Sequence, residues 1–241
     1  MTVVASSLAS TGNDSSRQVL KLIVAAAQNN GIGRKGTLPW TLKSEMAYFT
    51  KMTRTVRLPA ALRGLQVAND SGGDVCISMD GTEKRVLNAC IMGRHSWESI
   101  PLRYRPLNHR YNIVLTSNPG LLAGETSPLV ARAADLRDAL SHIEHINSDP
   151  ATGIFINDVF VIGGHAVYKA AMHSPNPVEI FMTRVQFSEA DTCDVFFPEI
   201  PKDSFTHQSF AELQARVPFK VQEGKLTEDN LEYEHQLFTK P

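Results

Sequence analysis

Two stretches of this chain, 111-YNIVLTS-117 and 158-DVFVIGG-164, are strand patterns in which apolar and β-branched residues follow one another almost without interruption. A strand with one face in water alternates apolar and polar residues, so these runs indicate strands that are buried on both faces. Helical patterns alternate with such runs along the chain, which predicts an α/β fold: a three-layer sandwich with a central, mostly parallel sheet and helices on both faces. The other strand candidates are 19–28, 88–92 and 178–187, with weaker ones at 205–210 and 231–238, and the helical patterns are 42–52, 94–99, 135–146 and 165–172.

Three segments stand outside this alternation. Residues 54–87 are rich in turn formers and predict a surface insertion, since structureless segments of that length are uncommon within a domain. Residues 212–230 resemble a loop or a hairpin connection. The Ser/Thr-rich start predicts a disordered tail over 1–17. No linker separates two cores, so we expect a single domain over 18–241.

Composition excludes several classes of protein. A net charge of -1 gives no electrostatic reason to expect nucleic acid or an anionic membrane as a partner, and no apolar run is long enough to span a bilayer. Three separated cysteines fit a reducing compartment rather than disulfides or zinc. The N-terminus has too few arginines for a transit peptide, which favours the cytoplasm. His142 and His145 share a helix face without further ligands, so no metal site is expected.

The segment 38-LPWTLKSEMAYFTKMT-53 places an acid where apolar residues are expected. At about 100° per residue, Leu42, Met46, Phe49 and Met52 fall on one apolar stripe of a helix, and Glu45 lies inside it. A carboxylate among apolar side chains loses hydration, which raises its pKa unless donors compensate. Glu45 is therefore a candidate functional acid.

Two glycine turns are candidate anion sites. In 90-CIMGRHSWESIP-101, Gly93 ends a strand and two basic residues open a short helix. In 159-VFVIGGHAVYKAA-171, Gly163–Gly164 again joins a buried strand to a helix. Free N–H groups at such turns suit phosphates, although an ordinary strand-to-helix turn gives the same pattern. The G-x-G-x-x-G fingerprint is absent.

Together these segments resemble the dihydrofolate reductase family, in the family's order and over most of the chain. Glu rather than Asp at the acid position, 196-FFPEI-200 and the long insertion are similar to eukaryotic, in particular fungal, single-function members. The resemblance implies an eight-stranded sheet of the dihydrofolate reductase type and a monomer. The segments that carry it are 24-VAAAQNNGIGRKGTLPW-40, 43-KSEMAYFTKMT-53, 91-IMGRHSWESIP-101, 105-RPLNHRYNIVLTS-117, 161-VIGGHAVYKAA-171, 183-TRVQF-187 and 194-DVFFPEI-200.

The resemblance also implies an activity and a substrate site. The reaction is NADPH-dependent reduction of 7,8-dihydrofolate to tetrahydrofolate, with hydride transfer to C6 and protonation at N5, in support of one-carbon metabolism and thymidylate synthesis; antifolate inhibitors are expected to bind. Glu45 matches the acid that holds the pterin, Thr183 a residue hydrogen-bonded to that acid, Trp40 the holder of a nearby water, and Leu38 a mobile-loop residue. Arg110 matches the arginine that pairs with the glutamyl α-carboxylate. The other implied substrate contacts are Ile23, Val24, Ala25, Leu42, Met46, Phe49, Ile100, Leu107 and Tyr168.

A cofactor site for NADPH follows from the same resemblance. Arg94, Thr116 and Ser117 match positions around the 2′-phosphate, and Gly163–Gly164 match a pair joined by a cis peptide. His109 stands where the family usually has glycine before the arginine, so we expect that turn to be built differently. The further implied cofactor contacts are Ala25, Ile32, Gly33, Gly93, His95, Ser96, Leu115, Ile162, His165, Ala166, Val167 and Tyr168.

Two other functions fit parts of the pattern. A pyrimidine reductase of riboflavin synthesis shares this fold and the NADPH site, but would not need Glu45, Phe49 and Arg110 together. A catalytically inactive nucleotide-binding module should have lost the acid or the glycines, and both are present. Folate binding would distinguish a dihydrofolate reductase from the pyrimidine reductase, and turnover would distinguish it from the inactive module.

Overall fold

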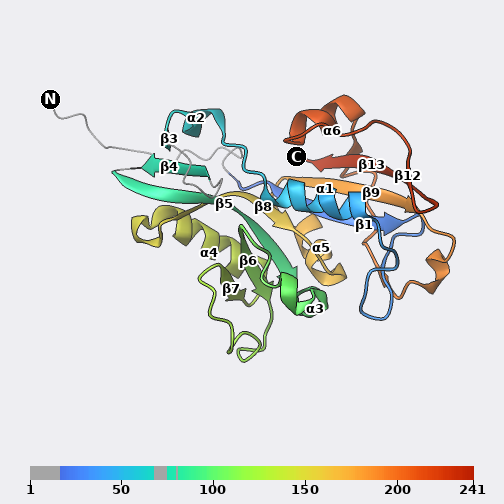
Figure 1. Ribbon diagram of the computed structural model, residues 1–241, viewed down its shortest axis with the longest axis horizontal. Helices are drawn as coiled ribbons and strands as arrows, with labels where there is room; N and C mark the ends of the chain where they lie inside the picture. Colours follow the sequence, from blue (N-terminus) through green and yellow to red (C-terminus); the bar gives the residue numbers. More distant parts are fainter. Residues whose placement is uncertain (1–16, 68–74, 80) are drawn as a thin grey trace.

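The computed structural model describes residues 17–67, 75–79 and 81–241. A twisted sheet crosses the molecule, and helices cover both of its faces (Figure 1). Of the predicted tail, only Arg17 lies within the described residues. The turn formers at 70–73 lie outside them. The helices are α1 (Lys43–Arg54), α2 (Ala60–Arg63), α3 (Arg94–Ser99), α4 (Leu136–Ser148), α5 (His165–Met172) and α6 (Phe210–Arg216), with short 3-10 turns η2 (Leu102–Tyr104), η3 (Pro150–Thr152) and η4 (Ala190–Thr192).

Within the described residues the main sheet has eleven strands. Its centre is a parallel array in the order β7-β6-β5-β8-β1-β9, and β13 closes one side antiparallel to β9. The expected count of eight is exceeded because short strands extend the edges. The strands are β1 (Leu20–Ala27), β3 (Gln66–Val67), β4 (Val75–Met79), β5 (Thr82–Gly93), β6 (Arg110–Leu115), β7 (Val130–Ala133), β8 (Ile154–Val161), β9 (Val178–Gln186), β11 (Thr206–His207), β12 (Leu226–Glu228) and β13 (Leu231–Lys240), while β2 (Gly31–Gly33) and β10 (Val195–Phe196) form a separate pair.

Two cores confirm the three-layer sandwich. On one face, Leu22 and Val24 of β1 pack with α4 and α5. On the other, Ile23 packs with residues of α1, α3 and α6, among them Met52 and Trp97. Successive strand residues point to opposite faces, so β1 contributes to both cores, and this double burial explains its continuous apolar run.

The structure differs from the expected elements in several places. β5 begins at Thr82 rather than at residue 88, and its first half pairs with β4, so much of 75–87 extends the central sheet. Ile77 and Val86, both buried, give this hairpin a small core of its own. The weak strand candidate at 205–210 is a two-residue strand, and a helix follows it.

The helix α6 lies where a loop was expected. Ser209 caps it, because the Ser209 hydroxyl accepts a hydrogen bond from the backbone N–H of Glu212. The S-x-x-E spacing is a capping pattern that is visible in the sequence. Further along, Asp229 and Asn230 take positive φ in the turn between β12 and β13, so the expected hairpin occupies only the end of 212–230.

Candidate active site

Glu45 on α1 is buried where three elements meet. Its side chain is 7% exposed, and burial raises its pKa from 4.5 to about 7. Burial, and then the charge of Glu45, raise the pKa of Tyr48 on α1 and of Tyr168 on α5, so both phenols lie near the carboxylate. Tyr168 also donates a hydrogen bond to the Ile23 carbonyl at 2.8 Å. Thus α1, α5 and β1 meet around one acid that has no side-chain hydrogen bond among the described residues.

Thr183 does not make the hydrogen bond that the resemblance implied. Its Oγ1 lies 3.2 Å from Nδ1 of His235, and within the described part of the chain Glu45 is not its partner. The reason is the register of the sheet, because His235 lies directly opposite Thr183 on β13. His235 was not identified from the sequence, since a weakly patterned terminal strand gave no indication of which residue would lie opposite Thr183.

Four of the expected substrate contacts, Met46, Phe49, Ile100 and Leu107, are partly or largely accessible to solvent. Met46 is 45% exposed, and Phe49, Ile100 and Leu107 are half-buried against the core that contains Ile23. Leu42 and Ala25 instead pack with Trp40 in a smaller, separate cluster. The side chain of Val24 belongs to the core on the opposite face of the sheet, so Val24 can contribute to the site only with its backbone.

Arg110, at the start of β6, is bonded to the last turn of α1. Its guanidinium donates from Nη1 to Thr53 Oγ1 at 2.9 Å and from Nε to the Asn108 carbonyl at 3.0 Å. Burial lowers its pKa, and among the described residues no carboxylate pairs with it. His109 takes a φ of 58°, so histidine adopts the left-handed turn that glycine would favour, and the turn is not rebuilt as expected.

The loop between β1 and α1 is held by a segment that lies far along the chain. β2 pairs with β10, and the Asp194 carboxylate accepts a hydrogen bond from the Lys35 N–H at 2.8 Å. Ile32 and Gly33 belong to this segment, and Leu38 follows as an exposed apolar residue. Trp40 is buried, edge-on to Phe187.

The two glycine turns lie side by side at the carboxyl ends of their strands. Gly93 N donates to the Gly163 carbonyl at 2.8 Å, and the Gly163–Gly164 peptide is cis. A Cβ on Gly163 would lie 3.0 Å from the Tyr168 ring, and one on Gly164 would lie 3.5 Å from Ser96 Oγ. Position 163, where φ is 108°, therefore requires glycine, whereas a Cβ on Gly164 would make only an ordinary contact. The remaining residues expected here, Ile162, Ala166 and Val167, flank the second turn in sequence.

Basic and polar groups surround these turns. Arg94 pairs with Glu98 at 3.3 Å and lies 3.1 Å from His95, and all three are exposed. His165 Nδ1 lies 2.7 Å from the Phe196 carbonyl, which links α5 to β10.

At the end of β6, Leu115 and Thr116 lead into the exposed Ser117. Arg132 on the neighbouring strand β7 donates to the Thr116 carbonyl at 3.3 Å. The sequence analysis did not include Arg132, because β7 was not among its strands.

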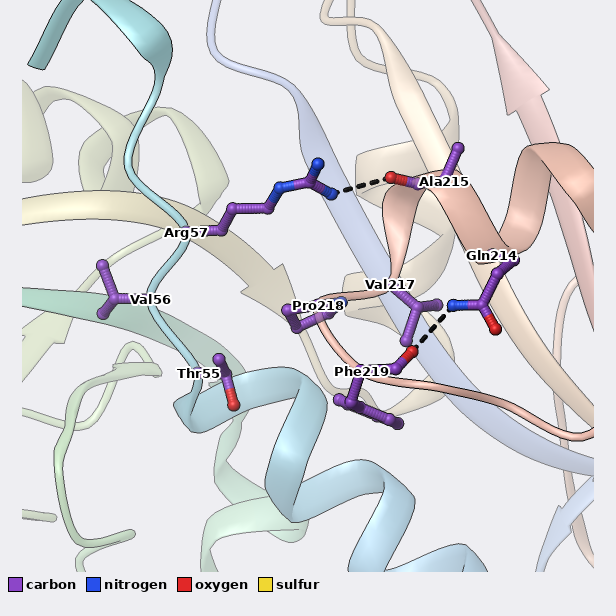
Figure 2. A pocket seen from close by; sticks show the side chains of 8 residues that line it. All are labelled: Thr55, Val56, Arg57, Gln214, Ala215, Val217, Pro218 and Phe219. Carbon is purple, nitrogen blue, oxygen red and sulfur yellow. Dashed lines mark hydrogen bonds between the residues drawn. The ribbon is translucent and has the colours of Figure 1, made fainter. Parts of the chain in front are cut away.

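A separate hollow lies outside this site (Figure 2). It is bordered by the chain after α1 and by the end of α6, where Arg57 donates to the Ala215 carbonyl and Gln214 to the Phe219 carbonyl, each at 2.8 Å. None of the predicted site residues lines it. Among the described residues, no cluster of potential metal ligands and no helix able to span a membrane occur.

The fold and the site together define an α/β enzyme built around one buried acid beside paired glycine turns. The family model for dihydrofolate reductase matches residues 19–58 and 83–222. A dihydrofolate reductase of Heliothis virescens is 39% identical over 77% of this chain and 82% of the relative, and one of Pneumocystis carinii is 34% identical over 92% and 96%. The solved structure of Schistosoma mansoni dihydrofolate reductase matches with a TM-score of 0.65 at 26% identity, covering 94% of this chain and all of that one. The chain belongs to the dihydrofolate reductase family.

Proposed function

We propose that this enzyme reduces 7,8-dihydrofolate to tetrahydrofolate with NADPH and thereby supplies one-carbon metabolism and thymidylate synthesis. The observation that carries the proposal is Glu45, a buried acid without a protein hydrogen-bond donor in the described chain, placed between β1 and α5. A carboxylate can accept two parallel hydrogen bonds, so it suits the 2-amino group and N3 of a pterin ring.

Each group of expected substrate contacts has a role in this proposal. Met46, Phe49, Ile100 and Leu107 would pack on the pterin and benzoyl rings, because apolar surface favours flat aromatic groups. Arg110 would bind the α-carboxylate of the glutamyl group, since its planar fork matches a carboxylate and none competes for it among the described residues. Glu45 would hold a proton close to neutral pH and raise the chance that water protonates N5, with Trp40 at the border of that space.

The glycine turns fit a phosphate-bearing cofactor. A Cβ on Gly93 would lie 3.2 Å from Val167 and one on Gly163 would lie 3.0 Å from Tyr168, and N–H groups at the starts of α3 and α5 are suited to a pyrophosphate. Arg94, Thr116, Ser117 and the neighbouring Arg132 would surround a 2′-phosphate. When bound, NADPH supplies the hydride for C6. The loop that carries Ile32, Gly33 and Leu38 would exclude water from the nicotinamide end.

The experiment is steady-state oxidation of NADPH by the purified protein with dihydrofolate, beside Glu45→Ala. We expect turnover by the wild type and a loss of about 10²–10⁴-fold in kcat for the variant, the usual contribution of a positioned acid. A wild type that binds NADPH but not folate would refute the substrate and support a pyrimidine reductase. Binding of both ligands without turnover would indicate an inactive module. Light scattering tests the monomer that we also propose.

A further inference from the structure

Asn112 is a fully buried amide on β6, two residues after Arg110. Its Nδ2 donates to the Leu107 carbonyl at 3.1 Å and to the Arg110 carbonyl at 2.9 Å, and its Oδ1 accepts from the Leu107 N–H at 3.0 Å. The Leu129 carbonyl lies farther from Nδ2, at 3.5 Å. A side-chain amide has two donor hydrogens and one acceptor oxygen. Asn112 therefore spends its whole polar group on backbone, and most of it on residues 107–110.

The segment that Asn112 bonds is a tight turn in an uncommon conformation. His109 has a φ of 58°, in the left-handed region that residues other than glycine rarely adopt. Such a backbone persists only where the surroundings hold it. The bonds from Asn112 reach Leu107 on one side of His109 and Arg110 on the other. Asn112 thus closes the turn across its strained residue.

This turn carries two of the residues assigned to the substrate. Leu107 packs with the core that contains Ile23. The Arg110 guanidinium donates from Nε to the Asn108 carbonyl at 3.0 Å, within the turn, and from Nη1 to Thr53 Oγ1 at 2.9 Å. One of these two acceptors therefore belongs to the segment that Asn112 closes. If the turn shifts, the Asn108 carbonyl and the Leu107 side chain move together.

We propose that Asn112 is a positioning residue for the benzoylglutamate half of the substrate, because it fixes Leu107 and Arg110 in one spatial relation. The amide itself touches no ligand, since its donors and its acceptor are already used. A turn that is fixed in advance lowers the cost of ordering these groups when the substrate binds. The proposal rests on the proposed function for the identity of the substrate.

The test compares two substrates in Asn112→Ala by steady-state kinetics. We expect the KM for dihydrofolate to rise about 3–10-fold, the range of one hydrogen bond. The kcat should stay within about twofold, because a loss of uniform binding changes KM alone. A 7,8-dihydropterin that lacks the benzoylglutamate group does not reach Leu107 or Arg110 in the proposed binding mode, so its KM should also stay within about twofold.

Asn147 of α4 provides the matched control. Its side chain also bonds both backbone groups of one residue, since Nδ2 donates to the Ile156 carbonyl at 2.9 Å and Oδ1 accepts from the Ile156 N–H at 2.6 Å. Asn147→Ala removes the same chemistry away from the turn. It should lower the free energy of unfolding and leave both KM values unchanged.

A double-mutant cycle shows whether Asn112 acts through Arg110. If it does, Asn112→Ala should raise the KM for dihydrofolate by no more than about twofold when Arg110 is already lysine, because residues that share one interaction are not additive. Fully additive effects, an equal rise in KM for the dihydropterin, or an unchanged KM for dihydrofolate would each overturn the proposal. If Asn112→Ala does not fold, Asn112→Ser, whose hydroxyl can keep one of the bonds, is judged by the same criteria.

Failure of the proposed function would give a different result, which is a wild type that does not reduce dihydrofolate. Hydrogen exchange in the ligand-free protein then decides whether Asn112 holds the turn. The Leu107 N–H should exchange about tenfold faster in Asn112→Ala than in Asn147→Ala, since local opening exposes that amide. Equal exchange rates in the two variants would overturn the proposal without reference to any substrate.

Discussion

Arg110 Nη1 donates a hydrogen bond to Thr53 Oγ1 at 2.9 Å, which joins the start of β6 to the last turn of α1. Asn88 strengthens this connection, because its side-chain amide donates to the carbonyls of Thr53 and Thr55. The guanidinium is thus aimed by two buried side chains before any ligand arrives, and an aimed cation binds a carboxylate without first losing side-chain freedom.

Replacing Arg110 should weaken substrate binding in a graded way. Arg110→Lys keeps the charge but loses the planar fork, so we expect the KM for dihydrofolate to rise about 10–100-fold, the range of a charged hydrogen bond. Thr53→Val leaves the guanidinium in place and should raise KM by only about 3–10-fold. Steady-state kinetics measure both. A folate analogue without the glutamyl group provides the control: if Arg110→Lys raises its KM equally, the proposed role is wrong.

Glu45 should lower stability at neutral pH. Its pKa is 4.5 in the unfolded chain and about 7 in the fold, so the folded state holds a proton that the unfolded state has lost between those values. Its contribution to the free energy of unfolding therefore falls as pH rises from about 4.5 to 7 and stays low above. A shift of 7 - 4.5 = 2.5 units corresponds to about 3 kcal/mol.

The matching variant is Glu45→Gln, which carries no charge at any pH. We expect urea denaturation to show a gain of about 2–3 kcal/mol over wild type at pH 8 and little difference at pH 4.5. If the free energy of unfolding rises by the same amount at both pH values, burial does not disfavour the ionised Glu45 carboxylate.

Arg132 should contribute to the choice of cofactor. It reaches the Thr116 carbonyl from β7, at the strand end where a 2′-phosphate is proposed to bind. Arg132→Ala should weaken NADPH binding about tenfold, as expected for one charged contact, and leave NADH binding unchanged. Titration of both cofactors by fluorescence measures this. Arg137→Ala, on α4, is the matched control. If Arg132→Ala weakens the binding of NADPH and NADH equally, Arg132 stabilises the end of β6 and does not recognise the phosphate.

The sequence predicted the parts of this molecule that repeat a local pattern. Continuous apolar runs predicted β1, β6 and β8 because strands buried on both faces leave no alternation. Glu45 was found because an acid on an apolar stripe is a local anomaly. His235 and Arg132 were missed because their importance comes from cross-strand register, which brings Thr183 and Thr116 beside them and which no local pattern encodes.

The segment 54–87 illustrates the opposite limit. Its turn formers predicted a surface insertion, which stays a prediction, and they gave no sign that Lys84 is 3% exposed and donates to the carbonyls of Ile146, Asn147 and Asp149 at the end of α4. A cation at a helix C-terminus satisfies carbonyls that have no partner within the helix. From the sequence alone, Lys84 resembles any surface lysine of a charged strand.

Lys84→Met should therefore cost stability and spare catalysis. Removing the ammonium leaves buried carbonyls without a donor, which we expect to lower the free energy of unfolding by about 2–4 kcal/mol. Because Lys84 lies far along β5 from the glycine turn at Gly93, kcat per folded molecule should stay within about twofold of wild type. Urea denaturation and active-site titration with a tight antifolate measure the two quantities. Lys202→Met, at an exposed lysine, is the control. A loss of kcat with unchanged stability would show that the hairpin of β4 and β5 acts on the active site instead of supporting α4.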